Sequence, residues 1–217
     1  MSKYKSVFVL VHGGWHNQSA WGQIKPILET GGAMVLALDL PGAGVNTIEP
    51  KSLEIRPFDL TAFATEPSSV ASVTQEQRTQ AVIVAVKEAA SRSDHVILVG
   101  HSAGGMTISA VAEQVPDLLA AVVYIAGFMV PNGMSLFAML SHGSMSSALS
   151  PGLFVGDPVG IGATRINPGP SDEPNGGALA PSQIHGRQIR HRPSPLYPDH
   201  ARLRCPLDRA GSHDCSD

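Results

Sequence analysis

The chain has 217 residues, of which 43% are hydrophobic and 15% charged, and this composition is typical of one globular domain with a substantial core. The formal net charge of −3 provides no basic surface for a nucleic acid or an anionic membrane, so neither partner is expected. No run approaches the roughly 18 apolar residues of a transmembrane helix. Both cysteines, Cys205 and Cys215, lie near the C-terminus, and the lack of a disulfide framework predicts a cytoplasmic location.

The first third of the chain predicts strand, helix and strand in turn, followed by a long loop. Residues 7–11 form an apolar run rich in β-branched side chains, which is typical of a strand buried on both faces. Apolar residues at helical spacing predict a helix over 19–30, which the pair Gly31-Gly32 would end. A second apolar run predicts a strand over 34–38, and residues 44–72 show no sustained period.

The same alternation continues through the middle of the chain. A capping-box pattern opens a predicted helix over 74–90, and an apolar run predicts a strand over 95–99. A helix over 106–114 and a strand over 120–125 follow. Strands that alternate with helices predict an α/β fold with a mostly parallel, doubly wound sheet. The Met-, Ser- and Gly-rich residues 129–151 are expected to form a small helical cap.

The segment Gly100-His101-Ser102-Ala103-Gly104 matches the G-x-S-x-G motif, directly between a predicted strand and a predicted helix. In that context the motif forms a nucleophile elbow, a strained corner whose small flanking residues let strand and helix approach closely. We therefore expect Ser102 to be a catalytic nucleophile and the Ala103 N–H to donate to an oxyanion. The alternative is the tight turn of a nucleotide-binding fold, but the spacing is neither G-x-G-x-x-G nor a P-loop.

A second glycine motif, His12-Gly13-Gly14-Trp15, follows the first predicted strand. A second oxyanion donor is expected from this loop, where glycines allow the backbone to approach a substrate, and Gly14 is the candidate. His12, His16 and His101 flank the predicted site. Each is interpreted as a structural histidine that bonds to nearby backbone, and none as the catalytic base.

These motifs resemble those of α/β-hydrolases of the hydroxynitrile lyase and plant methyl-esterase type, and of bacterial esterases that include pyrethroid hydrolases. The likeness covers about residues 5 to 170 in order. The segments that carry it are Val11 to His16 with Trp21, Asp39 to Gly42, Gly100 to Gly105 and Tyr124 to Phe128. The resemblance implies a small-molecule ester substrate, hydrolysis through an acyl-enzyme, and no metal or organic cofactor.

The residue at position 13 distinguishes the two activities of the resembled proteins, ester hydrolysis and cyanide release. Lyases of this type place a hydroxyl-bearing residue where this chain has Gly13, and glycine cannot bond to a cyanohydrin hydroxyl. The resemblance therefore favours ester hydrolysis, by attack of Ser102 on the ester carbonyl, over the alternative of cyanide release.

The C-terminal fifth departs from this pattern. In the resembled fold an Asp or Glu and then a His follow the nucleophile in the chain. Asp199 or Asp208 could serve as the acid and His213 as the base, but gaps of fourteen and five residues are short for an intervening strand and helix. The competing hypothesis is a shift of reading frame near His185, which would remove the family's acid, base and last strands and leave an inactive hydrolase fold.

The boundaries predicted on these grounds are a hydrolase core over residues 1–170, with the cap segment from about 129, and an atypical, poorly ordered tail over 171–217. A sheet without its last strands would leave an unpaired edge and an uncovered apolar face. Both features favour aggregation.

Overall fold

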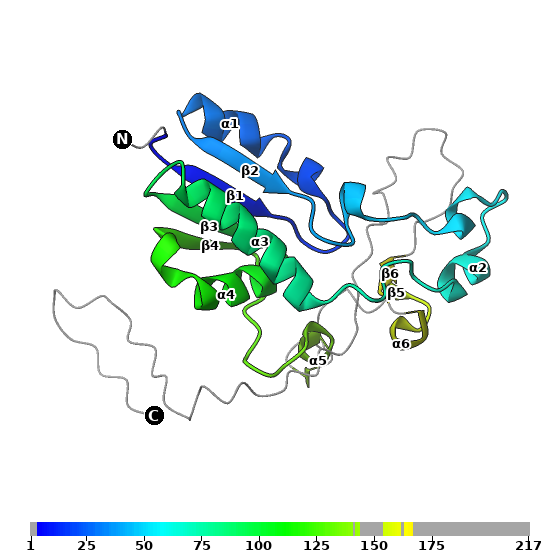
Figure 1. Ribbon diagram of the computed structural model, residues 1–217. Helices are drawn as coiled ribbons and strands as arrows, with labels where there is room; N and C mark the ends of the chain where they lie inside the picture. Colours follow the sequence, from blue (N-terminus) through cyan, green and yellow to red (C-terminus); the bar gives the residue numbers. More distant parts are fainter. Residues whose placement is uncertain (1–3, 141, 144–153, 162, 167–217) are drawn as a thin grey trace.

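Four parallel strands form the central sheet of the computed structural model, which describes residues 4–140, 142–143, 154–161 and 163–166. The strands lie in the order β2-β1-β3-β4 (Figure 1). Their bounds are Val7–Val11 for β1, Met34–Leu38 for β2, Val96–His101 for β3 and Ala121–Ile125 for β4. The parallel sheet predicted from the apolar runs is therefore confirmed, with small shifts of the strand ends.

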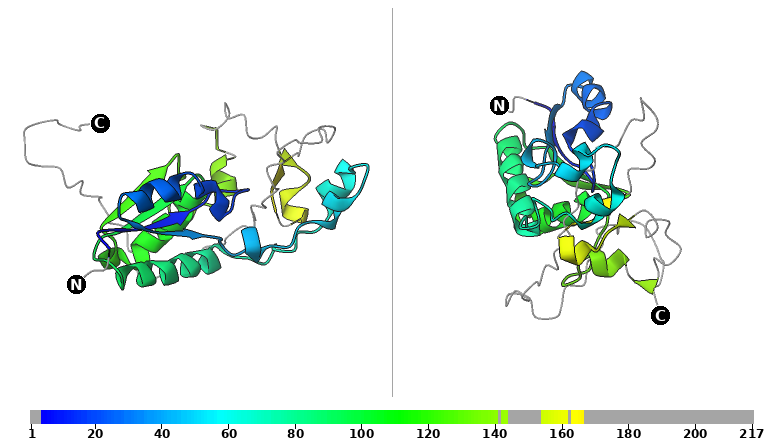
Figure 2. Two further views of the ribbon diagram at one scale, coloured as in Figure 1. Left: turned by 90° about the horizontal axis from the view of Figure 1, so that it is seen from above. Right: turned by 90° about the vertical axis from the view of Figure 1, so that its right-hand side faces the viewer.

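Helices cover both faces of this sheet. Helix α1 (Ile24–Thr30) lies on one face, and α3 (Gln75–Ala90) and α4 (Gly104–Gln114) lie on the other (Figure 2). Successive side chains of a strand point to opposite faces. Val9 accordingly packs in the core cluster on the α3 and α4 side, and Leu10 packs in the smaller cluster on the α1 side. The predicted doubly wound α/β fold is confirmed.

Two predicted helices begin or end differently in the structure. The helix predicted over 19–30 is wrong as a single element, because it divides into a 3-10 helix, Gln18–Trp21, and α1. The Asn17 side chain caps the first turn and Gly22 ends it. Helix α4 starts at Gly104, two residues before the predicted start, directly after the corner at Ser102.

Helix α3 begins as the sequence predicts. The Thr74 hydroxyl accepts the N–H of Gln77 at 3.1 Å, and the Gln77 side chain accepts the N–H of Thr74 at 2.8 Å. This reciprocal pair is a capping box, which satisfies two N–H groups that the first helical turn leaves without partners.

Strand β4 forms an edge of the sheet and pairs only with β3 among the described residues. Its apolar side chains Val123 and Ile125 are 40% and 44% exposed. They lie on the α1 side of the sheet, but α1 packs against β2, at the opposite edge. Among the described residues, the sheet therefore has an open edge at β4 and a partly uncovered apolar face beside it.

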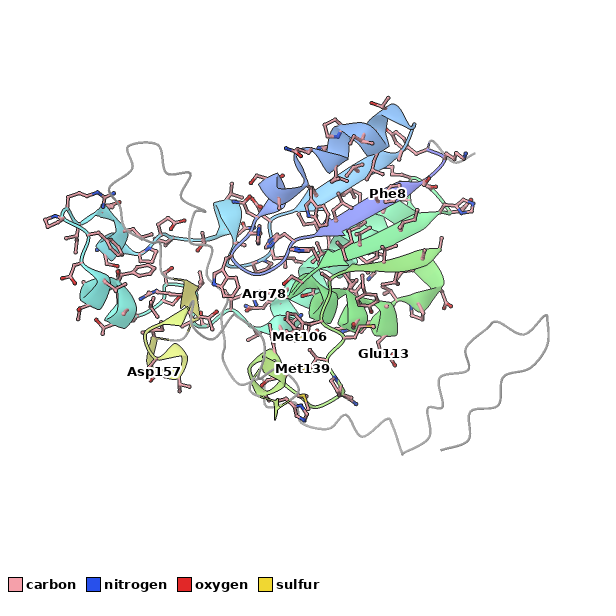
Figure 3. All side chains as sticks on the ribbon, turned by 180° about the vertical axis from the view of Figure 1, so that it is seen from behind. Phe8, Arg78, Met106, Glu113, Met139 and Asp157 are labelled. Atoms are coloured by element: carbon pink, nitrogen blue, oxygen red, sulfur yellow. The ribbon has the colours of Figure 1, made fainter. Side chains whose placement is uncertain are left out.

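A small lobe lies beyond the carboxyl ends of the strands (Figure 1). The elements that we call the lobe are the 3-10 helix Lys51–Glu54, α2 (Leu60–Thr65), β5 (Phe154–Val155), α6 (Pro158–Ile161) and β6 (Arg165–Ile166). The lobe is built from two segments far apart in the sequence. The Ser68 N–H donates to the Ile161 carbonyl at 2.8 Å and joins these two segments. The side chains of the lobe form a group apart from those around the sheet (Figure 3). The sequence predicted none of these elements.

The segment predicted as a cap contains the short helix α5 (Leu136–Leu140), and the cap itself stays a prediction. Further 3-10 turns span Gly44–Asn46 and Pro116–Leu118. Residues 171–217, with Asp199, Asp208 and His213, lie outside the described residues, so the interpretation of the tail stays a prediction. None of the helices in the described ranges is long and apolar enough to cross a membrane.

Candidate active site

Ser102 occupies a sharp corner between β3 and α4. Its backbone φ is 50°, in the left-handed region that residues other than glycine rarely adopt. The Ser102 N–H donates to the Ile125 carbonyl at 3.1 Å, and the Ser102 carbonyl accepts the N–H groups of Gly105 and Phe128 at 3.0 Å each. A strained residue that its surroundings hold so firmly is typical of a functional site.

Glycines give this corner the space that it needs. A β-carbon on Gly104 would lie 2.6 Å from the His12 carbonyl oxygen, and one on Gly105 would lie 2.7 Å from the Phe128 nitrogen. Both contacts are with backbone, which cannot turn aside as a flexible side chain can. The first turn of α4 can therefore approach the end of β1 at Gly104, and the loop after β4 at Gly105, only because these positions are glycine.

The loop after β1 lies directly against Ser102. A β-carbon on Gly13 would be 2.9 Å from the Ser102 β-carbon and 2.8 Å from Nδ1 of His101. Within the described residues, the N–H groups of Gly14 and Ala103 donate to no acceptor. Ser102 and Ala103 are thus consecutive at the corner, Gly13 brings the loop that contains Gly14 against Ser102, and the N–H groups of Gly14 and Ala103 have no acceptor among the described residues.

Two of the flanking histidines bond to nearby backbone, as predicted. His12 is 4% exposed, its Nδ1 lies 2.7 Å from the Gly13 carbonyl oxygen, and its Nε2 lies 3.3 Å from the Leu40 nitrogen. Burial lowers the pKa of His12, so the neutral ring is favoured. Nδ1 of His16 lies 2.6 Å from the Gly14 carbonyl oxygen.

The third histidine, His101, meets the His16 ring edge to face, with centroids 5.7 Å apart. Burial, and then the proximity of His16, lower the pKa of His101. No described side chain accepts a hydrogen bond from the Ser102 hydroxyl. The part of the chain that the structure describes therefore leaves the N–H groups of Gly14 and Ala103 without acceptors and places no base against the Ser102 hydroxyl.

Two residues near the site had no role in the sequence interpretation. Trp15 has a φ of 55°, and its indole N–H donates to the Thr164 carbonyl at 3.3 Å, which joins the glycine loop to the lobe. Arg78 of α3 donates from Nε to the Pro41 carbonyl at 3.2 Å, and burial lowers its pKa to about 10. Figure 3 shows Arg78 between the sheet and the lobe. Trp15 stands in the predicted loop motif, whereas no pattern marked Arg78.

A cavity of about 590 Å³ lies elsewhere, beside the edge strand β2. Its lining includes Trp21, Ala37 and Asp39, and none of the predicted site residues. Burial alone would raise the pKa of Asp39, but N–H groups of Gln18 and Val45 donate to its carboxylate and bring the pKa below its usual value. That carboxylate thus holds the loop after β2 and the 3-10 helix after β1 in place.

The chain is similar to several known proteins. The model of the alpha/beta hydrolase family matches residues 8–212. The chain is 34% identical to salicylic acid-binding protein 2 of Nicotiana tabacum over 122 residues, which cover 56% of this chain and 39% of that protein. It is 32% identical to polyneuridine aldehyde esterase of Rauvolfia serpentina over 136 residues, which cover 62% and 44%. The chain thus spans about two fifths of the length of these relatives.

A solved structure of a pyrethroid hydrolase from Sphingobium faniae JZ-2 gives a TM-score of 0.56 at 21% identity, over 75% of this chain and 56% of that chain. At this identity the likeness shows the fold alone. The family match and the plant relatives confirm the resemblance to α/β-hydrolases and plant esterases that the motifs indicated, and the pyrethroid hydrolase shares the fold.

Proposed function

Because the chain belongs to the alpha/beta hydrolase family, we propose that it is a serine hydrolase that cleaves carboxylic esters of small molecules. Ser102 is the nucleophile, and the N–H groups of Gly14 and Ala103 form the oxyanion hole. The observation that carries this proposal is the left-handed Ser102, flanked by two N–H groups that have no acceptor among the described residues. An elbow of this kind presents a hydroxyl and an oxyanion site to one carbonyl group.

The reaction is an acyl transfer in two halves. The Ser102 oxygen bonds to the ester carbonyl carbon and gives its proton to a base, while the carbonyl oxygen becomes an oxyanion that the Gly14 and Ala103 N–H groups hold. The tetrahedral intermediate collapses, the bond to the alcohol oxygen breaks, and the alcohol leaves with a proton. Water then attacks the acyl-enzyme, which releases the carboxylic acid and restores the serine.

The names of the relatives support an ester substrate. One relative is named polyneuridine aldehyde esterase, and another, from Arabidopsis thaliana, is named methylesterase 2. Cyanide release is the less favoured chemistry, because Gly13 carries no hydroxyl. A β-carbon at Gly13 would lie 2.9 Å from that of Ser102, so this backbone leaves no room for a hydroxyl-bearing side chain there.

A hydrolase fold that binds ligands without turnover is the second candidate. The observation in its favour is that no described side chain accepts the Ser102 hydroxyl proton, while His12 and His16 use Nδ1 at backbone carbonyls. A serine without a base and an acid loses several orders of magnitude in rate in well-studied triads.

Hydrolysis of p-nitrophenyl acetate by the purified chain and by its Ser102→Ala variant separates these candidates. We expect measurable turnover that falls to the uncatalysed rate in the variant, because the acyl-enzyme cannot form without the hydroxyl. Equal rates for the two proteins would reject the esterase and leave the binding-only candidate. Cyanide release from mandelonitrile by the same preparations would instead support a lyase.

A further inference from the structure

His12 is a buried histidine that the proposed mechanism does not use. The Leu40 N–H can only donate, so Nε2 of His12 must accept and the ring proton must reside on Nδ1. Nδ1–H then donates to the Gly13 carbonyl at 2.7 Å. One neutral tautomer satisfies both contacts, and burial, which lowers the pKa of His12, favours that neutral ring.

The carbonyl that His12 holds shares a peptide group with the Gly14 N–H. This peptide is trans, and in a trans peptide the carbonyl and the N–H point in opposite directions. With its carbonyl turned toward the buried ring, the peptide directs the Gly14 N–H away from it. Neither Gly13 nor Gly14 carries a β-carbon that would oppose rotation of this peptide, so the bond from His12 decides its orientation.

The opposite orientation would harm the chemistry. A flipped peptide would present the Gly13 carbonyl oxygen, a partial negative charge, where the Gly14 N–H is proposed to meet an oxyanion. The following peptide is held separately, because Nδ1 of His16 lies 2.6 Å from the Gly14 carbonyl oxygen. The two histidines therefore fix the peptides on both sides of Gly14.

We propose that His12 is a positioning residue, which holds the Gly13 carbonyl through Nδ1–H and thereby aims the Gly14 N–H at the oxyanion. It acts through the peptide and touches no reacting atom. This inference rests on the proposed function, since it assigns a role in the oxyanion hole of the same site.

Two substitutions of His12 distinguish the role of Nδ1 from that of Nε2. The amide of asparagine ends near the place of Nδ1, so His12→Asn keeps a donor for Gly13 and loses the acceptor for Leu40. The amide of glutamine reaches the place of Nε2, so His12→Gln keeps the acceptor for Leu40 and loses the donor for Gly13. Each variant gives up one hydrogen bond, which makes the pair a matched control for stability.

We expect kcat for p-nitrophenyl acetate to fall roughly 10- to 100-fold in His12→Gln with KM within about threefold, because loss of one oxyanion donor costs about 10²- to 10³-fold and a flipped peptide removes the donor part of the time. His12→Asn should stay within about threefold of the unsubstituted chain. A merely structural role predicts that kcat falls in both variants as their melting temperatures fall. Equal losses of kcat would overturn the inference.

The amide signal of Gly14, recorded with ¹⁵N-glycine labelling, tests the orientation without turnover. It should move in His12→Gln and remain in place in His12→Asn. If the unsubstituted chain shows no turnover that depends on Ser102, the proposed function fails, and this signal still decides the role of His12. A signal that moves equally in both variants, or in neither, would overturn it.

Discussion

The sheet and the lobe treat buried polar groups differently. At the sheet, His12 has both ring nitrogens bonded to backbone. In the lobe, Arg165 is 1% exposed, donates from Nη1 to the Phe63 carbonyl and lies over the Phe63 ring, yet its Nε and Nη2 have no hydrogen-bond partner among the described residues. The sheet also leaves one N–H unpaired, on Trp21, but a neutral indole loses far less on burial than a guanidinium. The buried ring of His12 is thus fully hydrogen-bonded, whereas the lobe buries a charge that is incompletely hydrogen-bonded among the described residues.

The largest predicted effect comes from truncating the sheet core. Leu98 of β3 is fully buried, so Leu98→Ala should lower the free energy of unfolding by about 2–5 kcal/mol through lost burial and a residual cavity. Denaturant unfolding followed by circular dichroism measures this. A loss below about 1 kcal/mol would show that the core around β3 is loosely packed.

The matched control lies in the lobe, where Phe63 is buried to the same extent. Because no element of the lobe packs extensively against a strand of the sheet among the described residues, Phe63→Ala should accelerate amide hydrogen exchange in α2 while β1 and β3 keep their protection. If exchange accelerated across the sheet as well, the two regions would unfold as one unit and the comparison would fail.

A smaller effect is expected at the corner of the site. The β-carbon introduced by Gly104→Ala would lie 2.6 Å from the His12 carbonyl oxygen, so the backbone must move. We expect a loss of about 1–3 kcal/mol in unfolding free energy, together with slower labelling of Ser102 by a fluorophosphonate. Gly143→Ala is the control, because a β-carbon on Gly143 would meet nothing within 4 Å. Similar effects of the two substitutions would refute the steric argument.

The sheet could be predicted from sequence because its signals are local. A few neighbouring residues are enough to predict each of three features: the strand that ends at Val11, the helix start at Thr74 and the corner at Ser102. The free N–H groups of Gly14 and Ala103 follow from the same motifs.

The lobe could not be predicted, because its elements depend on contacts between distant residues. Helix α2 has six residues and buries only Phe63, although Asp59 caps it by accepting the Ala62 N–H at 2.9 Å. Strands β5 and β6 have two residues each, and Arg165 finds its carbonyl partner about a hundred positions earlier in the chain. Only the cap at Asp59 was a readable signal.

The next prediction concerns the guanidinium of Arg165, which is only partly hydrogen-bonded among the described residues. Arg165→Met keeps much of the volume and removes a cation whose burial also lowers its pKa, so the free energy of unfolding should rise by about 1 kcal/mol. Thermal unfolding of Arg165→Met is compared with that of Arg165→Lys, which retains the buried charge. Only Arg165→Met should be stabilised if the charge is the cause. Destabilisation by Arg165→Met would show that Nε and Nη2 bind a group that stabilises the fold.

The smallest effect is a pH dependence that belongs to the sheet alone. Burial lowers the pKa of His12 in the folded chain below its ordinary value of 6.5, so between these two values the unfolded chain binds more protons. The contribution of His12 to stability is therefore complete above pH 6.5 and is lost as the pH falls through this window. His101, whose pKa is also lowered, acts in the same direction.

Urea unfolding between pH 7.5 and 5 should therefore show a shallower decline for His12→Asn than for the unsubstituted chain, since asparagine does not titrate. The same measurement on His101→Asn gives the contribution of His101 to the pH dependence of the unfolding free energy. The described residues of the lobe include no histidine, so Phe63→Ala should leave the pH slope unchanged. Parallel slopes for His12→Asn and the unsubstituted chain would mean that His12 keeps its ordinary pKa in the fold. The ring would then accept a second proton, and its single tautomer, on which the orientation of the Gly14 N–H depends, would hold only at higher pH.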